Sequence, residues 1–306
     1  MASPQLQLVL ELLRSRESDR SVEPSIEEMR EGLERSASIF PIFPEVAREA
    51  TDAPGVACEW IAHPSETHDP VILYFHGGAY ALGSVATHRH LMARLAHESH
   101  ARVLGIDYRR APEHPFPAAI DDAVAAYRWA LNQGSLPSEI VLVGDSAGGG
   151  LALAALIALR DAGDPLPAAA AVMSPWVDLE GTAESIERNA AHDPMINRES
   201  LLRAAEAYLD GADPRHPLAA PLHAELHGLP PLLIQAGGKE ALLDDAVRFA
   251  DKARAAGVNV RLECWEDMMH VWQFFAPLLP EGRQALVQIG EFIRGATGGG
   301  LLAQAS

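Results

Sequence analysis

A serine flanked by two glycines lies between a strand-like run and a helix-like run. Residues 140–143 are apolar, and Ser146 follows with Gly144 and Gly148 two positions to either side, before the alanine- and leucine-rich residues 151–160. Such a Gly-x-Ser-x-Gly turn between a strand and a helix is typical of an exposed nucleophilic serine. Glycine suits the flanking positions because a Cβ atom there would collide with the strand or the helix. The alternative is a plain strand-to-helix connection with an incidental serine.

Acyl transfer by a serine needs backbone donors for the oxyanion, a general base, and an acid that orients the base. Gly77 and Gly78 follow the apolar residues 71–75 after the single residue His76, so their N–H groups could face the space above Ser146. The N–H of Ala147 would complete the oxyanion hole, since the residue after the nucleophile supplies one donor in such sites. We therefore predict Gly77, Gly78 and Ala147 as oxyanion donors, with a plain turn as the alternative for the glycine pair.

The base and the acid are expected late in the chain, because α/β-hydrolases order their triad as serine, acid and histidine. His270 follows a strand-like run at 258–265 after a short acidic loop, and we predict it as the base. Glu240 follows another strand-like run at 232–236 and is the predicted acid. Asp244 stays open as the alternative acid, although a carboxylate at the start of a helix more often stabilises its first turn.

Strand-like and helix-like stretches alternate from about residue 56 onwards. The expected strands are residues 56–62, 71–75, 102–107, 140–143, 168–174, 232–236 and 258–265. The expected helices are residues 88–100, 118–131, 151–160, 198–209, 244–256 and 284–294. This alternation predicts an α/β fold with a doubly wound, mostly parallel sheet, in which the first strand is an antiparallel edge strand.

Two segments do not follow this alternation. Residues 1–45 contain two helical patterns, the second preceded by a capping box at its start. Residues 179–221 contain a helical pattern but no strand-like run, and they interrupt the sheet at the edge where ligands bind in open α/β sheets. We expect residues 46–178 and 222–306 to form the core, and residues 1–45 and 179–221 to form a helical cap over it.

Composition and charge exclude several classes of partner. The net charge of −18 argues against nucleic acids and anionic membrane surfaces, since both attract basic proteins. We find no run of about 18 apolar residues that could span a membrane and no signal peptide, so we expect a cytoplasmic protein. Cys58 and Cys264 form no disulfide framework. His223 and His227 lack a spaced third ligand, so we predict no metal site there, and we expect no cofactor.

Three blocks in this order resemble the hormone-sensitive-lipase-like (family IV) bacterial carboxylesterases of the α/β-hydrolase fold. Residues 76–80 (HGGAY) are similar to the family's HGG(G/A) loop, and residues 107–117 (DYRRAPEHPFP) to its D-Y-R-x-A-P-E-x-x-F-P block. Residues 144–149 (GDSAGG) are similar to its serine elbow. Where many members have D-P-L-x-D, this chain has Glu240 to Asp244; some members are similar in using glutamate, which supports Glu240 and leaves Asp244 open.

The resemblance, which covers about residues 71–270, implies an eight-stranded α/β-hydrolase sheet with a helical cap. It also implies a serine carboxylesterase that hydrolyses short- to medium-chain acyl esters through an acyl-enzyme intermediate, with a small-molecule ester as its partner. A deacetylase or amidase that acts on a specific metabolite is the nearest alternative, because the triad serves esters and amides alike. A non-catalytic ligand-binding receptor of the same fold is a further alternative. The sequence leaves the oligomeric state open, a homodimer being one option.

Overall fold

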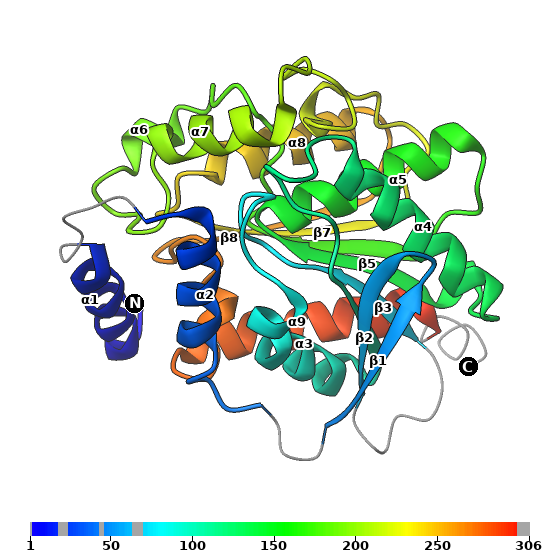
Figure 1. The fold of residues 1–306 in the computed structure, drawn as a ribbon, viewed down its shortest axis with the longest axis horizontal. Coiled ribbons are helices and arrows are strands. Elements are labelled where there is room, and N and C mark those ends of the chain that lie inside the picture. The colour runs from blue at the N-terminus through cyan, green and yellow to red at the C-terminus, as the bar shows by residue number, and fades with distance from the viewer. Residues whose placement is uncertain (1, 18–23, 43–45, 63–69, 299–306) are drawn as a thin grey trace.

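The computed structural model describes residues 2–17, 24–42, 46–62 and 70–298 (Figure 1). In these residues eight strands form one sheet, in the order β1-β2-β4-β3-β5-β6-β7-β8. Strand β2 is antiparallel to both β1 and β4, and the remaining neighbours are parallel. The strands are β1 (Ala47–Ala53), β2 (Val56–Ala62), β3 (Val71–Phe75), β4 (Arg102–Ile106), β5 (Ile140–Asp145), β6 (Ala169–Met173), β7 (Leu232–Gly237) and β8 (Val260–Trp265). The predicted α/β-hydrolase architecture, a mostly parallel eight-stranded sheet, is confirmed.

Helices cover both faces of the sheet. They are α1 (Pro4–Glu17), α2 (Ile26–Ala37), α3 (Val85–Ser99), α4 (Ala118–Asn132), α5 (Ala147–Ala162), α6 (Ser185–Arg188), α7 (Arg198–Leu209), α8 (Leu243–Ala255) and α9 (Pro280–Thr297). The short 3₁₀ helices are η1 (Pro137–Glu139), η2 (Pro221–His223) and η3 (Trp272–Phe275). Helices α3 and α9 lie on one face, and α4, α5 and α8 lie on the other (Figure 1). No helix in the described part of the chain is long and apolar enough to cross a membrane.

The central strands are continuous apolar runs because both of their faces are buried. Successive side chains of a strand point to opposite faces. Leu73 therefore joins the core beneath α4 and α5, whereas its neighbours Ile72 and Tyr74 join the core beneath α3 and α9. Every residue of β3, β5, β6 and β7 is buried. This double burial fixes the carboxyl ends of these strands, where the predicted site residues follow.

The edge of the sheet differs from the sequence prediction. Residues 56–62 form a strand as expected, but β1 lies outside it and pairs with it from Ala47 opposite Ala62 to Ala53 opposite Val56. The prediction that residues 56–62 are the edge strand is therefore wrong. The first four residues of β1 are exposed, so apolar and polar residues do not alternate along it. Its sequence therefore gives little indication of a strand.

The N-terminal helices and the 179–221 segment contact loops that follow the strands. On α2, the Arg30 guanidinium donates to the backbone oxygens of Ala81 and Ala111, in the loops after β3 and β4. On α6, the Ser185 hydroxyl donates to the backbone oxygen of Ala241, in the loop after β7. In Figure 1, α6 and α7 lie above the sheet as it is drawn, and α1 and α2 lie at the left of the view, lower than α6.

Candidate active site

Ser146 occupies a strained turn between the end of β5 and the start of α5. Its backbone has φ 53° and ψ −122°, a region that residues with side chains rarely adopt. Hydrogen bonds hold it there: its N–H donates to the Met173 oxygen at 2.8 Å, and its own oxygen accepts from the Trp176 N–H at 3.0 Å. The strain presents the side chain at the sheet's carboxyl edge, as the predicted elbow requires.

The two flanking glycines are needed for a close approach of backbone to backbone. A Cβ atom on Gly144 would lie 2.2 Å from the Gly148 oxygen. A Cβ atom on Gly148 would lie 2.0 Å from the Phe75 oxygen, at the end of β3. Both separations are far below van der Waals contact, so glycine is required here for packing between the elbow and the loop after β3.

The structure brings Ser146, His270 and Glu240 together in one buried cluster. The Nε2 atom of His270 lies 2.9 Å from the Ser146 hydroxyl oxygen, which is hydrogen-bond distance. On the other side of the ring, Nδ1 lies 3.9 Å from the nearer carboxylate oxygen of Glu240. Ser146 is 9% exposed, His270 2% and Glu240 0%. A serine, a histidine and a carboxylate in this order can transfer a proton from the serine hydroxyl to the imidazole.

Glu240 is oriented by a serine that the sequence analysis did not single out. The Ser174 hydroxyl donates to the Oε2 atom of Glu240 at 2.6 Å, and the Gly237 N–H donates to the same oxygen at 3.0 Å. Ser174 also accepts from the Val271 N–H at 3.1 Å, so one hydroxyl contacts the loops of both the acid and the base. Its position directly after β6, between the strands that bear the other residues, is the signal that could have found it.

Burial shifts both titratable partners toward their neutral forms. Desolvation raises the pKa of Glu240 well above its usual range, against the opposing hydrogen bonds from Ser174 and Gly237. Desolvation lowers the pKa of His270, and the negative charges of Asp193 and Asp145 oppose that change. A low pKa keeps the imidazole unprotonated, which is the form that can accept a proton.

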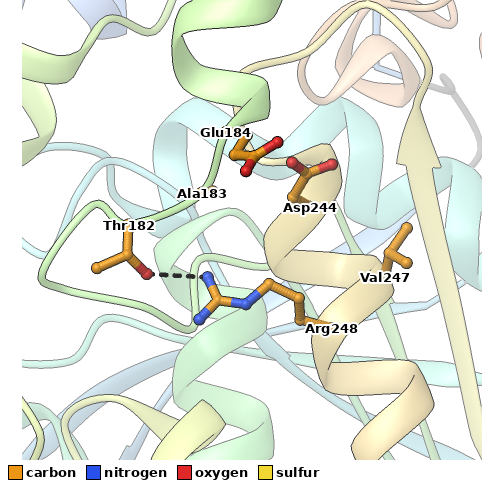
Figure 2. Close-up of a pocket in the computed structure, with 6 residues that line it drawn as sticks. All are labelled: Thr182, Ala183, Glu184, Asp244, Val247 and Arg248. Atoms are coloured by element: carbon orange, nitrogen blue, oxygen red, sulfur yellow. Dashed lines mark hydrogen bonds between the residues drawn. The ribbon is translucent and has the colours of Figure 1, made fainter.

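Asp244, the alternative acid, faces the 179–221 segment. Its carboxylate accepts from the Ser185 N–H at 2.8 Å and lies 2.6 Å from the Arg188 guanidinium. Figure 2 shows it beside Glu184 at a cavity of about 270 Å³ between this segment and α8. The cavity is lined by Thr182, Ala183, Glu184, Asp244, Val247 and Arg248. These contacts engage Asp244 with the neighbouring segment, whereas Glu240 has the carboxylate nearer to His270.

The loop after β3 supplies backbone N–H groups near the elbow, but not all of them are free. The Gly77 N–H donates to the Oδ1 atom of Asp145 at 2.9 Å, and a Cβ atom on Gly77 would lie 2.2 Å from that carboxylate. Because its N–H already donates to Asp145, Gly77 is not kept among the proposed oxyanion donors. Within the described ranges, the N–H groups of Gly78, Ala79 and Ala147 make no hydrogen bond.

Asp145 anchors this loop to the elbow. Its carboxylate accepts from the Tyr74 hydroxyl at 2.5 Å and lies 3.4 Å from Nε2 of His88. Burial alone would raise the pKa of Asp145, but the His88 charge and these hydrogen bonds outweigh it, so the pKa lies below its usual value. The elbow and the glycine loop are therefore fixed to one buried carboxylate.

His76, which precedes the glycine pair, supports the loop as a neutral ring. Burial lowers its pKa to about 3, and its Nδ1 atom lies 2.9 Å from the Gly77 oxygen. The Tyr108 ring stacks on it at 4.3 Å, and the Tyr108 hydroxyl donates to the His76 oxygen at 2.7 Å. Two of the sequence blocks, 76–80 and 107–117, thus meet at this stack.

A second cavity, of about 460 Å³, lies beside the loops that carry the acid and the base. Its lining combines apolar and polar side chains of α1 with side chains of three loops. The lining residues are Ala2, Leu6, Gln7, Leu10, Arg14, His192, Lys239, Asp267 and Met269. Lys239 and Met269 are the chain neighbours of Glu240 and His270. Two residues that line the cavity are therefore adjacent in sequence to the predicted acid and base.

One group of side chains lies at distances from one another that metal ligands adopt. In the described ranges, Asp178, Glu180 and His223 have ligand atoms within 4.8 Å of one another. However, Asp178 already pairs with the Arg248 guanidinium at 3.1 Å, and Glu180 pairs with that of Arg215 at 2.8 Å. These cations occupy the carboxylates that a metal ion would need, and His227, considered with His223 in the sequence, is not in the group.

The sequence is similar to a hydrolase family and to individual hydrolases. Residues 72–274 match the family described as the alpha/beta hydrolase fold. An acetyl-hydrolase of Streptomyces hygroscopicus is 48% identical over 98% of this chain and 100% of its own length. An esterase of Acinetobacter venetianus is 41% identical over 86% of this chain and 87% of its own length.

Solved structures give the same result. The crystal structure of an esterase from the bacterial hormone-sensitive lipase family has a TM-score of 0.94 at 49% identity, over 97% of this chain and 100% of that chain. The crystal structure of EstE5 soaked by p-nitrophenyl butyrate has a TM-score of 0.93 at 45% identity, over 96% of this chain and 99% of that chain. Likeness at this identity extends over nearly the whole of both chains.

Proposed function

Because the chain belongs to the bacterial hormone-sensitive-lipase-like esterases of the α/β-hydrolase fold, we propose that it hydrolyses short- to medium-chain acyl esters through an acyl-enzyme intermediate. In this proposal Ser146 is the nucleophile, His270 is the general base and Glu240 is the acid that orients it. The observation that carries the proposal is the 2.9 Å contact between His270 Nε2 and the Ser146 hydroxyl at a strained elbow.

The first step forms the acyl-enzyme. His270 takes the Ser146 proton as the hydroxyl oxygen attacks the ester carbonyl, and the resulting imidazolium is stabilised by the Glu240 carboxylate. The N–H groups of Gly78, Ala79 and Ala147 donate to the oxyanion, with Ala79 taking the place first assigned to Gly77. When the tetrahedral intermediate collapses, the imidazolium gives its proton to the leaving alcohol.

The second step releases the acid. A water molecule gives a proton to the neutral His270 and attacks the acyl carbonyl, and the same N–H groups stabilise the second oxyanion. Collapse returns the proton from His270 to the Ser146 oxygen, so the enzyme is regenerated. Loss of one oxyanion donor typically costs about 10²–10³ in kcat.

The proposal includes a helical cap made of residues 1–45 and 179–221 over a core of residues 46–178 and 222–306. Residues 1, 18–23 and 43–45 of the first segment, and residues 63–69 and 299–306 of the core, lie outside the described residues. Support comes from Arg30 of α2, which bonds to loops after β3 and β4, and from Ser185 of α6, which bonds to the loop after β7. Such a cap would restrict access to Ser146 and select the acyl chain.

The name of the Streptomyces relative favours an acetyl group as the acyl part, and it keeps a deacetylase as the second candidate. An acyl-chain profile with p-nitrophenyl esters from acetate to decanoate, run beside p-nitroacetanilide, would separate an esterase from an amidase. The homodimer and the cytoplasmic location stay predictions from the sequence.

The nucleophile is tested by Ser146→Ala with p-nitrophenyl butyrate as substrate. We expect kcat to fall by about 10⁴-fold or more, because only binding and oxyanion stabilisation remain. A fluorophosphonate probe should label the wild type and not the variant. Undiminished turnover in the variant would overturn the proposal, and an unlabelled, inactive wild type would favour the ligand-binding receptor instead.

A further inference from the structure

Asp193 is a buried carboxylate of the proposed cap that contacts the loop of the catalytic acid. It lies between α6 and α7 and is only 6% exposed. One of its oxygens, Oδ2, accepts from the Ala241 N–H at 2.8 Å, across 48 residues of chain. The other oxygen accepts from the N–H groups of Met195 at 2.9 Å and Ile196 at 3.2 Å. The carboxylate thus joins its own turn to the residue that follows Glu240.

A neighbouring side chain also bonds to this loop. The Asn189 amide donates to the backbone oxygen of Glu240 at 2.8 Å and to that of Gly238 at 3.3 Å. Residues 189–193 therefore bond to the acid loop at Gly238, Glu240 and Ala241. The backbone that carries Glu240 is fixed by the cap as well as by its own strand.

The charge of Asp193 also acts on the triad. It is the foremost group that opposes the burial-induced fall in the pKa of His270, and it raises the pKa of Glu240. The other charged groups that act on the pair come from the core: Asp145 at the end of β5 acts on His270, and Asp245 on α8 acts on Glu240. Glu240 in turn raises the pKa of Cys264 on β8.

The core carboxylates are engaged elsewhere. Asp145 bonds to Tyr74 and Gly77, and Asp245 accepts from the Val177 and Asp178 N–H groups at 3.1 and 3.0 Å. Among the groups that act on the triad, Asp193 alone in the described residues comes from the cap segment.

We propose that Asp193 is a positioning residue: it docks the cap on the acid loop, and its negative charge stabilises the imidazolium that forms on His270 during acyl transfer. This inference rests on the proposed function, because it needs His270 as the base. The basicity of His270 then depends on the docking of the cap, and His270 would be a weaker base in a molecule whose cap is not docked.

The test is the pH dependence of kcat/KM in Asp193→Asn, measured with p-nitrophenyl butyrate. The negative charge of Asp193 raises the pKa of both Glu240 and His270, so it favours proton binding whichever of the two holds the proton. In the pH profile, the acid limb is the part in which kcat/KM falls as the pH is lowered. Removal of the charge should therefore move this acid limb to lower pH, by about 0.5 pH unit or more. We also expect the plateau kcat to fall by about 10-fold, because the imidazolium loses a stabilising charge.

Ser185→Ala is the matched control. It removes the 2.6 Å hydrogen bond from the Ser185 hydroxyl to the Ala241 oxygen, a neutral contact between the same segment and the same loop. We expect a lower Tm with the acid limb at the wild-type position. If the Asp193→Asn protein does not fold, Asp193→Ser keeps a hydroxyl acceptor without the charge and should show the same shift.

Two outcomes contradict different claims. An acid limb that coincides in Asp193→Asn, Asp193→Ser, Ser185→Ala and the wild type would overturn the inference and leave Asp193 a purely structural residue. A wild type that a fluorophosphonate probe does not label at Ser146 would instead overturn the proposed function. A wild type that is labelled, with a limb that shifts in both Asp193 variants alone, supports both claims.

Discussion

Replacement of the proposed acid by its amide, Glu240→Gln, tests the charge behind the imidazole. The nearer Glu240 oxygen lies 3.9 Å from Nδ1 of His270. At an effective dielectric constant of about 20, opposite charges at that distance attract by about 4 kcal/mol. If this attraction is realised only when His270 is protonated in the transition state, its loss lowers kcat by about 10³-fold.

The amide keeps an oxygen that can accept from Ser174 and Gly237, so the fold should persist. Rates with p-nitrophenyl butyrate at pH 8, together with Tm, would separate catalysis from stability. Asp244→Asn is the matched control, since it weakens only the partly exposed pair with Arg188, which is worth about 0–1 kcal/mol. A large loss of kcat in Asp244→Asn and near wild-type kcat in Glu240→Gln would refute the reasoning.

Three further predictions follow from burial and close contact. Because burial lowers the pKa of His270 below 6.5, the acid limb of wild-type kcat/KM should have its midpoint below pH 6.5; a midpoint above pH 7 would contradict this. In Gly148→Ala the new Cβ atom, 2.0 Å from the Phe75 oxygen, must push the elbow away from the glycine loop; we expect about 10²-fold lower kcat, and wild-type kcat would count against it. Burial raises the pKa of Asp245 to about 7, so the folded state binds this proton more tightly than the unfolded state does, and stability should fall from about pH 4 to pH 7. Urea unfolding should show that fall, of a few kcal/mol, in the wild type and not in Asp245→Asn; parallel pH profiles would disprove it.

The parts of the site that could be predicted from the sequence are those whose signal lies within a few consecutive residues. The elbow around Ser146 and the loop that contains Gly78 each follow a buried apolar strand, so local pattern and strand order place them together. His270 could be found because it follows the last strand of the sheet. The family assignment follows from these same blocks and from the order in which they occur.

Other parts depend on contacts that the sequence does not display. Ser174 reaches Glu240 across 66 residues, and the bond between Gly77 and Asp145 spans 68. Strand β1 is held by its backbone pairing with β2, so its polar side chains give no sign of it. The choice between Glu240 and Asp244 depends on which way each carboxylate points, that of Glu240 from the loop after β7 and that of Asp244 from the first turn of α8. Chain spacing cannot decide that, because the loop folds around partners from the 179–221 segment.

The first described residues of the chain are tied to its last helix. The Ser3 N–H and hydroxyl donate to the Glu281 carboxylate at 2.6 and 2.8 Å, and Leu6 and Val9 of α1 share a core with Trp272. During synthesis α1 therefore emerges from the ribosome long before its binding surface exists. At about 5–20 residues per second, the roughly 260 residues between α1 and Glu281 take about 13–50 s to be made. Through that interval the apolar side chains Leu6 and Val9 of α1 have no core to pack against, so docking of α1 onto the finished protein is a late step of folding.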